Sequence, residues 1–178
     1  MNMIQSAKDQ VLQLTVAAYE KAAAAGALPA GITVVPAVEI PKDTANGDYT
    51  TTFCLAAAKA MKMNPRQVAQ TLIDNMALEG SYFTSVELAG PGFLNFRLGN
   101  KWYADTVSGI EAAGDAYGEN DMLAGKKYMV EFVSANPTGP MHMGNARGGV
   151  LGDTLASVLQ KSGADVTREF YVNDAGNQ

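Results

Sequence analysis

The stretch that most constrains the fold of this chain runs from Val130 to Arg147. It starts as an apolar run, continues through a turn dense in proline and glycine, and opens a helical pattern at the only histidine of the chain, His142. A strand, a tight turn and a helix N-terminus in that order form a site for phosphate groups. The stretch therefore predicts the first part of a nucleotide-binding sheet.

The residues that open this helix suit a bound nucleotide. His142 can donate to a phosphate or ribose oxygen, Gly144 leaves room for close approach, and Asn145 can donate from its amide. Arg147 either assists or faces solvent or an acid. Neither a Walker-type loop nor Gly-x-Gly-x-x-Gly after a strand occurs in the sequence, so the familiar phosphate motifs are excluded. The pattern indicates ATP and the charge that develops on its α-phosphate.

Composition limits the possible classes. Apolar residues make up 47% and the net charge is −5, which indicates a globular core and at most local contact with RNA. A single cysteine, Cys54, excludes internal disulfides and, with one histidine, a Cys/His zinc site. The sequence shows no signal peptide and no apolar stretch of about 18 residues, so we expect a cytoplasmic protein without a membrane span.

Hydrophobic periodicity predicts two domains of different class. We expect helices at 3–26, 55–63, 65–79 and 101–113, and strands at 32–35, 38–40, 49–53, 82–88 and 93–98. The last two strands are expected to form a hairpin. Asn64 is expected to cap the third helix, with Gln67 completing a capping box. The apolar face of the first helix is expected to consist of Ile4, Val11, Leu14, Ala18 and Ala22. These elements predict an α+β domain over residues 1–113, followed by a linker at 114–125.

Residues 126–178 predict one βαβ unit of α/β class. A buried parallel strand is expected at 127–133, a helix at 144–161 and a second strand at 166–172. Two strands cannot form a stable fold alone, so this unit is expected to be the start of a doubly wound sheet.

The residues from Glu131 to Asn145 resemble the first signature block of arginyl-tRNA synthetases, which are class I aminoacyl-tRNA synthetases. The segment from Asp165 to Gln178 is similar to the continuation of that block. The resemblance implies an N-terminal α+β tRNA-binding domain followed by the start of a Rossmann-like catalytic domain. It implies binding of ATP, with Mg²⁺, at His142, Gly144 and Asn145, and catalytic roles for His142 and Asn145. The class signature has a second histidine where this chain has Asn145, which cannot carry charge.

The resemblance also implies a site for L-arginine. Its positions here are Glu131, Ser134, Asn136 and His142. Glu131 interrupts an apolar strand, and a buried carboxylate there needs a cationic partner, which arginine would supply. The alternative is an internal salt bridge from Glu131 to Lys127 or Arg168.

Residues 1–113 resemble the extra N-terminal domain with which this family docks on the D-loop of tRNA. The run from Gly90 to Phe96 matches the motif that touches a D-loop base. Phe93 is expected to stack on an unpaired base and Asn95 to read its edge. The alternative is that Phe93, Leu94 and Phe96 are alternating strand residues, some of them in the core. Asn95 and Arg97 would then share one face, with Phe96 on the other.

The function that the resemblance implies is ATP-dependent attachment of L-arginine to tRNA(Arg) through arginyl-adenylate, with no DNA or membrane partner. Neither a Lys-Met-Ser-Lys-Ser loop nor a helical anticodon-binding domain appears in the sequence. We therefore expect the chain to be part of a longer enzyme and to be inactive alone. The alternative is a standalone RNA- or partner-binding module that keeps the motif without the chemistry.

Overall fold

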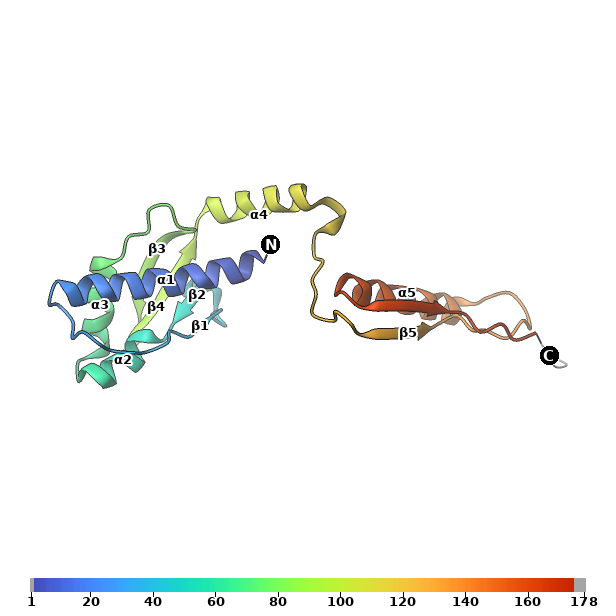
Figure 1. Cartoon of the computed structure of the whole chain (residues 1–178), viewed down its shortest axis with the longest axis horizontal. Coiled ribbons are helices and arrows are strands. Elements are labelled where there is room, and N and C mark those ends of the chain that lie inside the picture. The colour runs from blue at the N-terminus through green and yellow to red at the C-terminus, as the bar shows by residue number, and fades with distance from the viewer. Residues whose placement is uncertain (1, 175–178) are drawn as a thin grey trace. The chain divides into compact units, whose positions relative to one another are not determined.

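The computed structural model describes residues 2–174, which fall into two compact units divided between Ala112 and Ala113 (Figure 1). The sequence places its domain boundary after residue 113. The last four residues of the segment that resembles the family continuation, 175–178, lie outside the described residues. Within the described part of the chain, no helix has the length and apolar character needed to cross a membrane.

The first unit combines helices with one antiparallel sheet. Its elements are α1 (Met3–Ala24), β1 (Val38–Glu39), the short 3-10 helix η1 (Thr44–Asn46), β2 (Tyr49–Thr51), α2 (Phe53–Met61), α3 (Pro65–Asn75), β3 (Phe83–Ala89), β4 (Phe93–Leu98) and α4 (Asn100–Ala113). The strands lie in the order β1-β2-β4-β3, all antiparallel (Figure 1). The predicted hairpin is confirmed as β3–β4.

The two faces of this sheet have different characters, because successive side chains of a strand point to opposite sides. On one face, Leu94 and Phe96 of β4 are fully buried in a core that α1, α2 and α3 share. On the other face, Thr50 of β2 lies opposite Asn95 of β4, which lies opposite Glu87 of β3. The sheet thus has an apolar face under the helices and a polar face away from them.

The structure corrects the sequence prediction of the first unit at several points. The third helix, α3, ends at Asn75 rather than at residue 79. Ile4 is 51% exposed, whereas Met3 is buried with Ala7, Val11, Ala18 and Ala22, so the buried stripe of α1 begins one residue earlier. No strand forms at 32–35. There the Tyr19 hydroxyl accepts the N–H of Ile32, which leaves that group unavailable to a strand.

The second unit is a single βαβ element. It contains η2 (Gly114–Ala116), β5 (Lys127–Glu131), α5 (Met143–Lys161) and β6 (Asp165–Glu169), with β5 and β6 parallel. Phe132 packs tightly on α5, since a Cβ added to Gly152 would lie 2.3 Å from Cγ of Phe132.

The prediction of a buried strand at 127–133 is wrong in extent and in burial. β5 ends at Glu131, and four of its five residues are exposed. Among the described residues, only α5 and β6 contact it substantially, so much of its surface is uncovered. The helix starts at Met143, one residue before the predicted start, and β6 ends at Glu169 rather than at residue 172.

Candidate functional site

The turn between β5 and α5 is held in a strained conformation. Val133 has φ +60°, a left-handed value that a β-branched residue rarely adopts. Its carbonyl accepts the N–H of Ala135 at 2.7 Å, and the carbonyl of Asn136 accepts the N–H of Thr138 at 2.9 Å. Strain of this kind, of order 1–3 kcal/mol, persists where surrounding structure fixes it, and it commonly occurs at functional sites.

His142 and Asn145 cap the N-terminus of α5 reciprocally. Nδ1 of His142 accepts the backbone N–H of Gly144 at 3.1 Å, and Oδ1 of Asn145 accepts the backbone N–H of His142 at 3.1 Å. Because Nδ1 is an acceptor, the hydrogen bonds assign the proton of the neutral ring to Nε2. Nε2–H of His142 and the amide NH₂ of Asn145 are thus the donors left for a ligand.

Gly144 is required by this cap. A Cβ at position 144 would lie 2.8 Å from Cε1 and 3.0 Å from Nδ1 of His142, closer than ordinary van der Waals contact. The glycine of the His-x-Gly motif therefore lets the imidazole ring fold back over the first turn of the helix. The sequence suggested a different reason, the close approach of a nucleotide.

A cavity of about 600 Å³ lies at this helix start. It is lined by residues 135–142 together with Asn145 and Phe170. Asn136, His142 and Asn145 therefore lie around one space, at the positive end of the α5 dipole, which favours anions. Gly144 instead lines a separate, more apolar hollow together with Arg147.

Two of the predicted arginine-binding residues, Ser134 and Asn136, are hydrogen-bonded to the segment after β6. Oγ of Ser134 accepts the backbone N–H of Tyr171 at 3.0 Å, and Oδ1 of Asn136 accepts from Nδ2 of Asn173 at 2.6 Å. These bonds fasten the turn to the segment after β6. Phe170, Tyr171 and Asn173 were not predicted as part of the site. Their only sequence signal was the resemblance of the segment from Asp165 to Gln178 to the family continuation, and they follow β6, whose parallel pairing with β5 runs to Glu131 and Glu169.

Glu131 differs from the prediction because its side chain is exposed rather than buried. In the described part of the chain neither alternative partner reaches it. Lys127 lies 3.9 Å from Asp165, and Arg168 hydrogen-bonds Asp153 and two neighbouring side chains of α5. Within residues 2–174, therefore, no salt bridge to Lys127 or Arg168 neutralises this carboxylate.

A second cavity, of about 330 Å³, lies on the polar face of the first unit. Its lining includes the predicted pair Phe93 and Asn95, with Ala89 and Gly90 of the hairpin, Pro41, Lys42 and Asn46 of the loop before β2, and Thr50. Phe93 is half-buried and Asn95 is only 8% exposed. Leu94 and Phe96, by contrast, belong to the core, as the alternative expected for some residues of this strand, and Asn95 lies on the opposite face.

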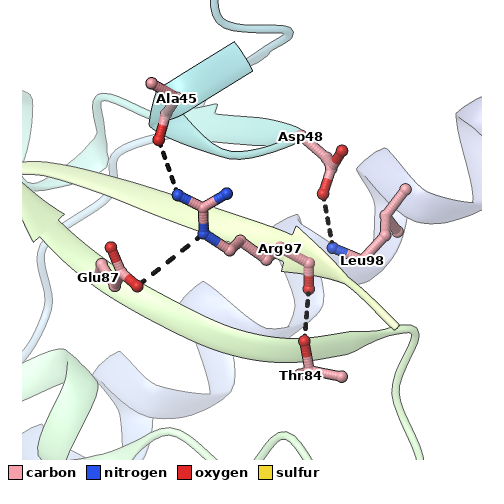
Figure 2. Close-up of polar contacts among 6 residues, drawn as sticks. All are labelled: Ala45, Asp48, Thr84, Glu87, Arg97 and Leu98. Atoms are coloured by element: carbon pink, nitrogen blue, oxygen red, sulfur yellow. Dashed lines mark hydrogen bonds and ion pairs between the residues drawn. The ribbon is translucent and has the colours of Figure 1, made fainter. Parts of the chain in front are cut away.

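Charged side chains near this cavity hold the loop before β2 against β4 (Figure 2). Arg97 of β4 donates to the carbonyl of Ala45 in η1 at 2.7 Å and lies 3.9 Å from Glu87 of β3. Asp48 accepts the backbone N–H of Leu98 at 2.8 Å. Arg66 of α3 donates to the carbonyl of Gly90. The loop and the hairpin are thus each anchored to the body of the unit.

Family comparisons assign both units. Residues 10–98 match the model for the arginyl tRNA synthetase N-terminal domain, and residues 107–178 match the class I tRNA synthetase (R) catalytic domain. The chain is 50% identical over 99% of its length to an arginine–tRNA ligase of Acetivibrio thermocellus, and 45% identical over 99% to one of Ruminiclostridium cellulolyticum. It spans 31% of the length of each.

A solved structure shares the fold. The arginyl-tRNA synthetase of Plasmodium falciparum aligns with a TM-score of 0.51 at 17% identity, over 96% of this chain and 31% of that protein. At this identity the similarity bears on the fold alone.

Proposed function

The chain belongs to the arginyl-tRNA synthetase family, and from this premise we propose that it supplies the tRNA-docking domain and one half of the catalytic site of an arginine–tRNA ligase. The ligase would join L-arginine and ATP to arginyl-adenylate and then esterify tRNA(Arg). The cytoplasm is the proposed compartment, supported by the single, buried cysteine.

The reciprocal cap at α5 is the observation that carries the proposal. In adenylation, a carboxylate oxygen of arginine attacks the α-phosphorus of ATP, the bond to the bridging oxygen breaks, and pyrophosphate leaves with the electron pair. Nε2–H of His142 and the amide of Asn145 would donate to the phosphate oxygens whose charge increases. Asn145 acts as a neutral donor, so Mg²⁺ brought with ATP would supply positive charge there.

The proposed arginine site lies at the end of β5. Glu131 is an exposed carboxylate that neither Lys127 nor Arg168 neutralises, so it remains available to a cationic substrate. Ser134 and Asn136 follow it in the turn, and Asn136 lines the same cavity as His142. Charge-assisted hydrogen bonds are stronger than neutral ones, so Glu131 is expected to contribute most.

ATP–pyrophosphate exchange by the full-length ligase, with tRNA present, tests this assignment. Glu131→Gln and Asn136→Ala should raise the KM for arginine or lower kcat by about 10-fold or more, since a hydrogen bond to a charged group contributes about 1.5–3 kcal/mol. Glu111→Gln, on the exposed side of α4, is the charge-matched control and should leave exchange unchanged.

If Glu131→Gln and Asn136→Ala both leave exchange unchanged, the arginine assignment is wrong. A full-length protein without any exchange activity would refute the ligase proposal and favour the standalone RNA-binding alternative.

A further inference from the structure

We propose that Thr50 is a specificity-determining residue, whose hydroxyl reads the edge of the nucleobase that Asn95 also contacts. This rests on the proposed tRNA-docking function and on the sequence prediction that Phe93 and Asn95, which both line the cavity of about 330 Å³, bind an unpaired base of the tRNA D-loop. No role was predicted for Thr50 from the sequence, in which it lies 45 positions before Asn95.

The sheet register brings the two side chains together. Thr50 and Asn95 are directly opposite partners in the β2–β4 ladder. Opposite residues in an antiparallel pair share a face and have Cβ atoms about 4.5–5.5 Å apart. That spacing lets one planar ligand span both side chains. Phe93, two residues before Asn95 on the same face of β4, supplies an aromatic surface at the side of the same cavity.

Thr50 also has an unmet hydrogen-bonding requirement. Its residue is only 9% exposed, and Oγ1 is the one buried side-chain oxygen or nitrogen among the described residues without a hydrogen-bond partner. A polar group buried without a partner is costly and rare in native proteins. The neighbouring Thr51, on the core face, has the hydrogen bond that a buried hydroxyl normally makes, because its Oγ1 accepts the N–H of Phe53 at 3.3 Å.

The chemistry around Thr50 selects the class of ligand. Asn95 is only 8% exposed, and its side-chain amide offers one acceptor and two donors. This amide makes no hydrogen bond to another of the described residues. Lys42 adds a cation at the cavity, which suits the phosphate of a bound nucleotide. A ring to stack on, two polar side chains one strand apart and a cation together fit a nucleotide with a splayed base.

The test is binding of the 178-residue chain to tRNA(Arg) transcripts in which each unpaired D-loop nucleotide is made abasic in turn. Thr50→Val keeps the shape and removes the hydroxyl. It should weaken binding of the intact transcript about 5-fold, as expected for one neutral hydrogen bond. It should leave binding unchanged for the transcript that lacks the base read by this cavity. Asn95→Ala should likewise weaken binding of the intact transcript and leave binding of one abasic transcript unchanged. That transcript is the one that lacks the base bound in this cavity.

A stability measurement separates recognition from a structural role. Thr50→Val should raise the Tm, because it removes an unpaired buried hydroxyl and places a good strand former in β2. Thr51→Val is the matched control on the next residue. It should lower the Tm by removing the bond from Phe53 and leave RNA binding unchanged.

The other possible outcomes contradict either the role of Thr50 or the base-binding function of the cavity. If Asn95→Ala weakens binding but Thr50→Val does not, the role of Thr50 is wrong and the base site stands. If Thr50→Val weakens intact and abasic transcripts equally, or lowers the Tm, its effect is structural and the inference fails. If Phe93→Ala and Asn95→Ala are both without effect, the base-binding function of the cavity is itself wrong.

Discussion

The two units of this chain bury their apolar residues to very different extents. In the first, side chains from three helices and the sheet form one core in which Phe53, Phe96 and Leu72 are almost wholly buried. In the second, the buried residues of α5 are only Gly152 and Ala156, while Val150 and Leu151 are each 70% exposed. The two units also carry different proposed tasks, tRNA docking and substrate activation.

The contrast shows that helices and strands alone do not supply a buried apolar core. Burial of apolar area is the main favourable term in folding, so the first unit has its own source of stability. One helix on a two-stranded sheet has little of that term and relies on specific contacts. Those of the second unit include Arg168 with Asp153, and Lys161 with Glu119 at 2.8 Å. We therefore expect mutations to act on the two units by different mechanisms.

Truncation of an apolar side chain should show the largest difference. Phe96 is fully buried with its ring centroid 5.3 Å from that of Phe83, so Phe96→Ala should cost the first unit about 3–5 kcal/mol. Leu151→Ala, at an exposed position of α5, should change the second unit by less than about 0.5 kcal/mol. Native-state hydrogen exchange measures both, with β4 amides for the first unit and α5 amides for the second. Equal losses would contradict the comparison.

Alkaline pH should destabilise the first unit through Cys54. Burial raises the pKa of this thiol to about 12 from the ordinary 9.0. The folded state therefore holds the proton more tightly than the unfolded state, and the stabilisation is complete below pH 9 and lost as the pH rises toward 12. The loss should approach about 1.4 kcal/mol per pH unit. Urea unfolding followed by the single tryptophan, Trp102, measures it.

Cys54→Ala is the control for this pH dependence. It should remove the part of the loss that begins near pH 9 and leave a smaller one from Tyr49, whose pKa burial also raises. In the Cys54→Ala background, Val158→Cys places a thiol at a 57% exposed position of α5, which should react with a thiol reagent at neutral pH far faster than Cys54 does. Comparable reaction rates would show that the thiol reagent reaches Cys54 and that the core of the first unit does not protect it.

Much of this fold was predictable because local signals and tertiary structure agree. The β3–β4 hairpin, the cap of α3 by Asn64 and the β5–α5–β6 order follow from turn residues and periodicity. The segment 32–35 shows the limit. It has β-prone residues, and Ile32 and Val34 pack on the core, but the Tyr19 hydroxyl occupies the N–H of Ile32 and also donates to the carbonyl of Pro29.

The candidate sites likewise contain some features that local sequence predicts and others that depend on contacts between distant segments. His142 and Asn145 lie three residues apart, so their joint place at the start of α5 could be predicted from the sequence. Thr50 faces Asn95 only through the register of two strands distant in sequence, which no local pattern specifies. The exposure of Glu131 was not predicted, because an apolar run indicates a strand that can be buried but does not specify whether other elements cover it.

Two glycines of α5 give the most direct test of packing in the second unit. A methyl group at Gly152 would lie 2.3 Å from Cγ of Phe132, so Gly152→Ala should cost about 1–3 kcal/mol by forcing the helix off the segment after β5. Gly148, in the same helix, has nothing within 4 Å of an added Cβ, so Gly148→Ala should stabilise α5 by about 0.5–1 kcal/mol. Hydrogen exchange of α5 amides gives both values. Helix propensity favours alanine at either position, so only the contact with Phe132 makes the signs opposite. If both variants stabilise α5, that contact does not hold the second unit together.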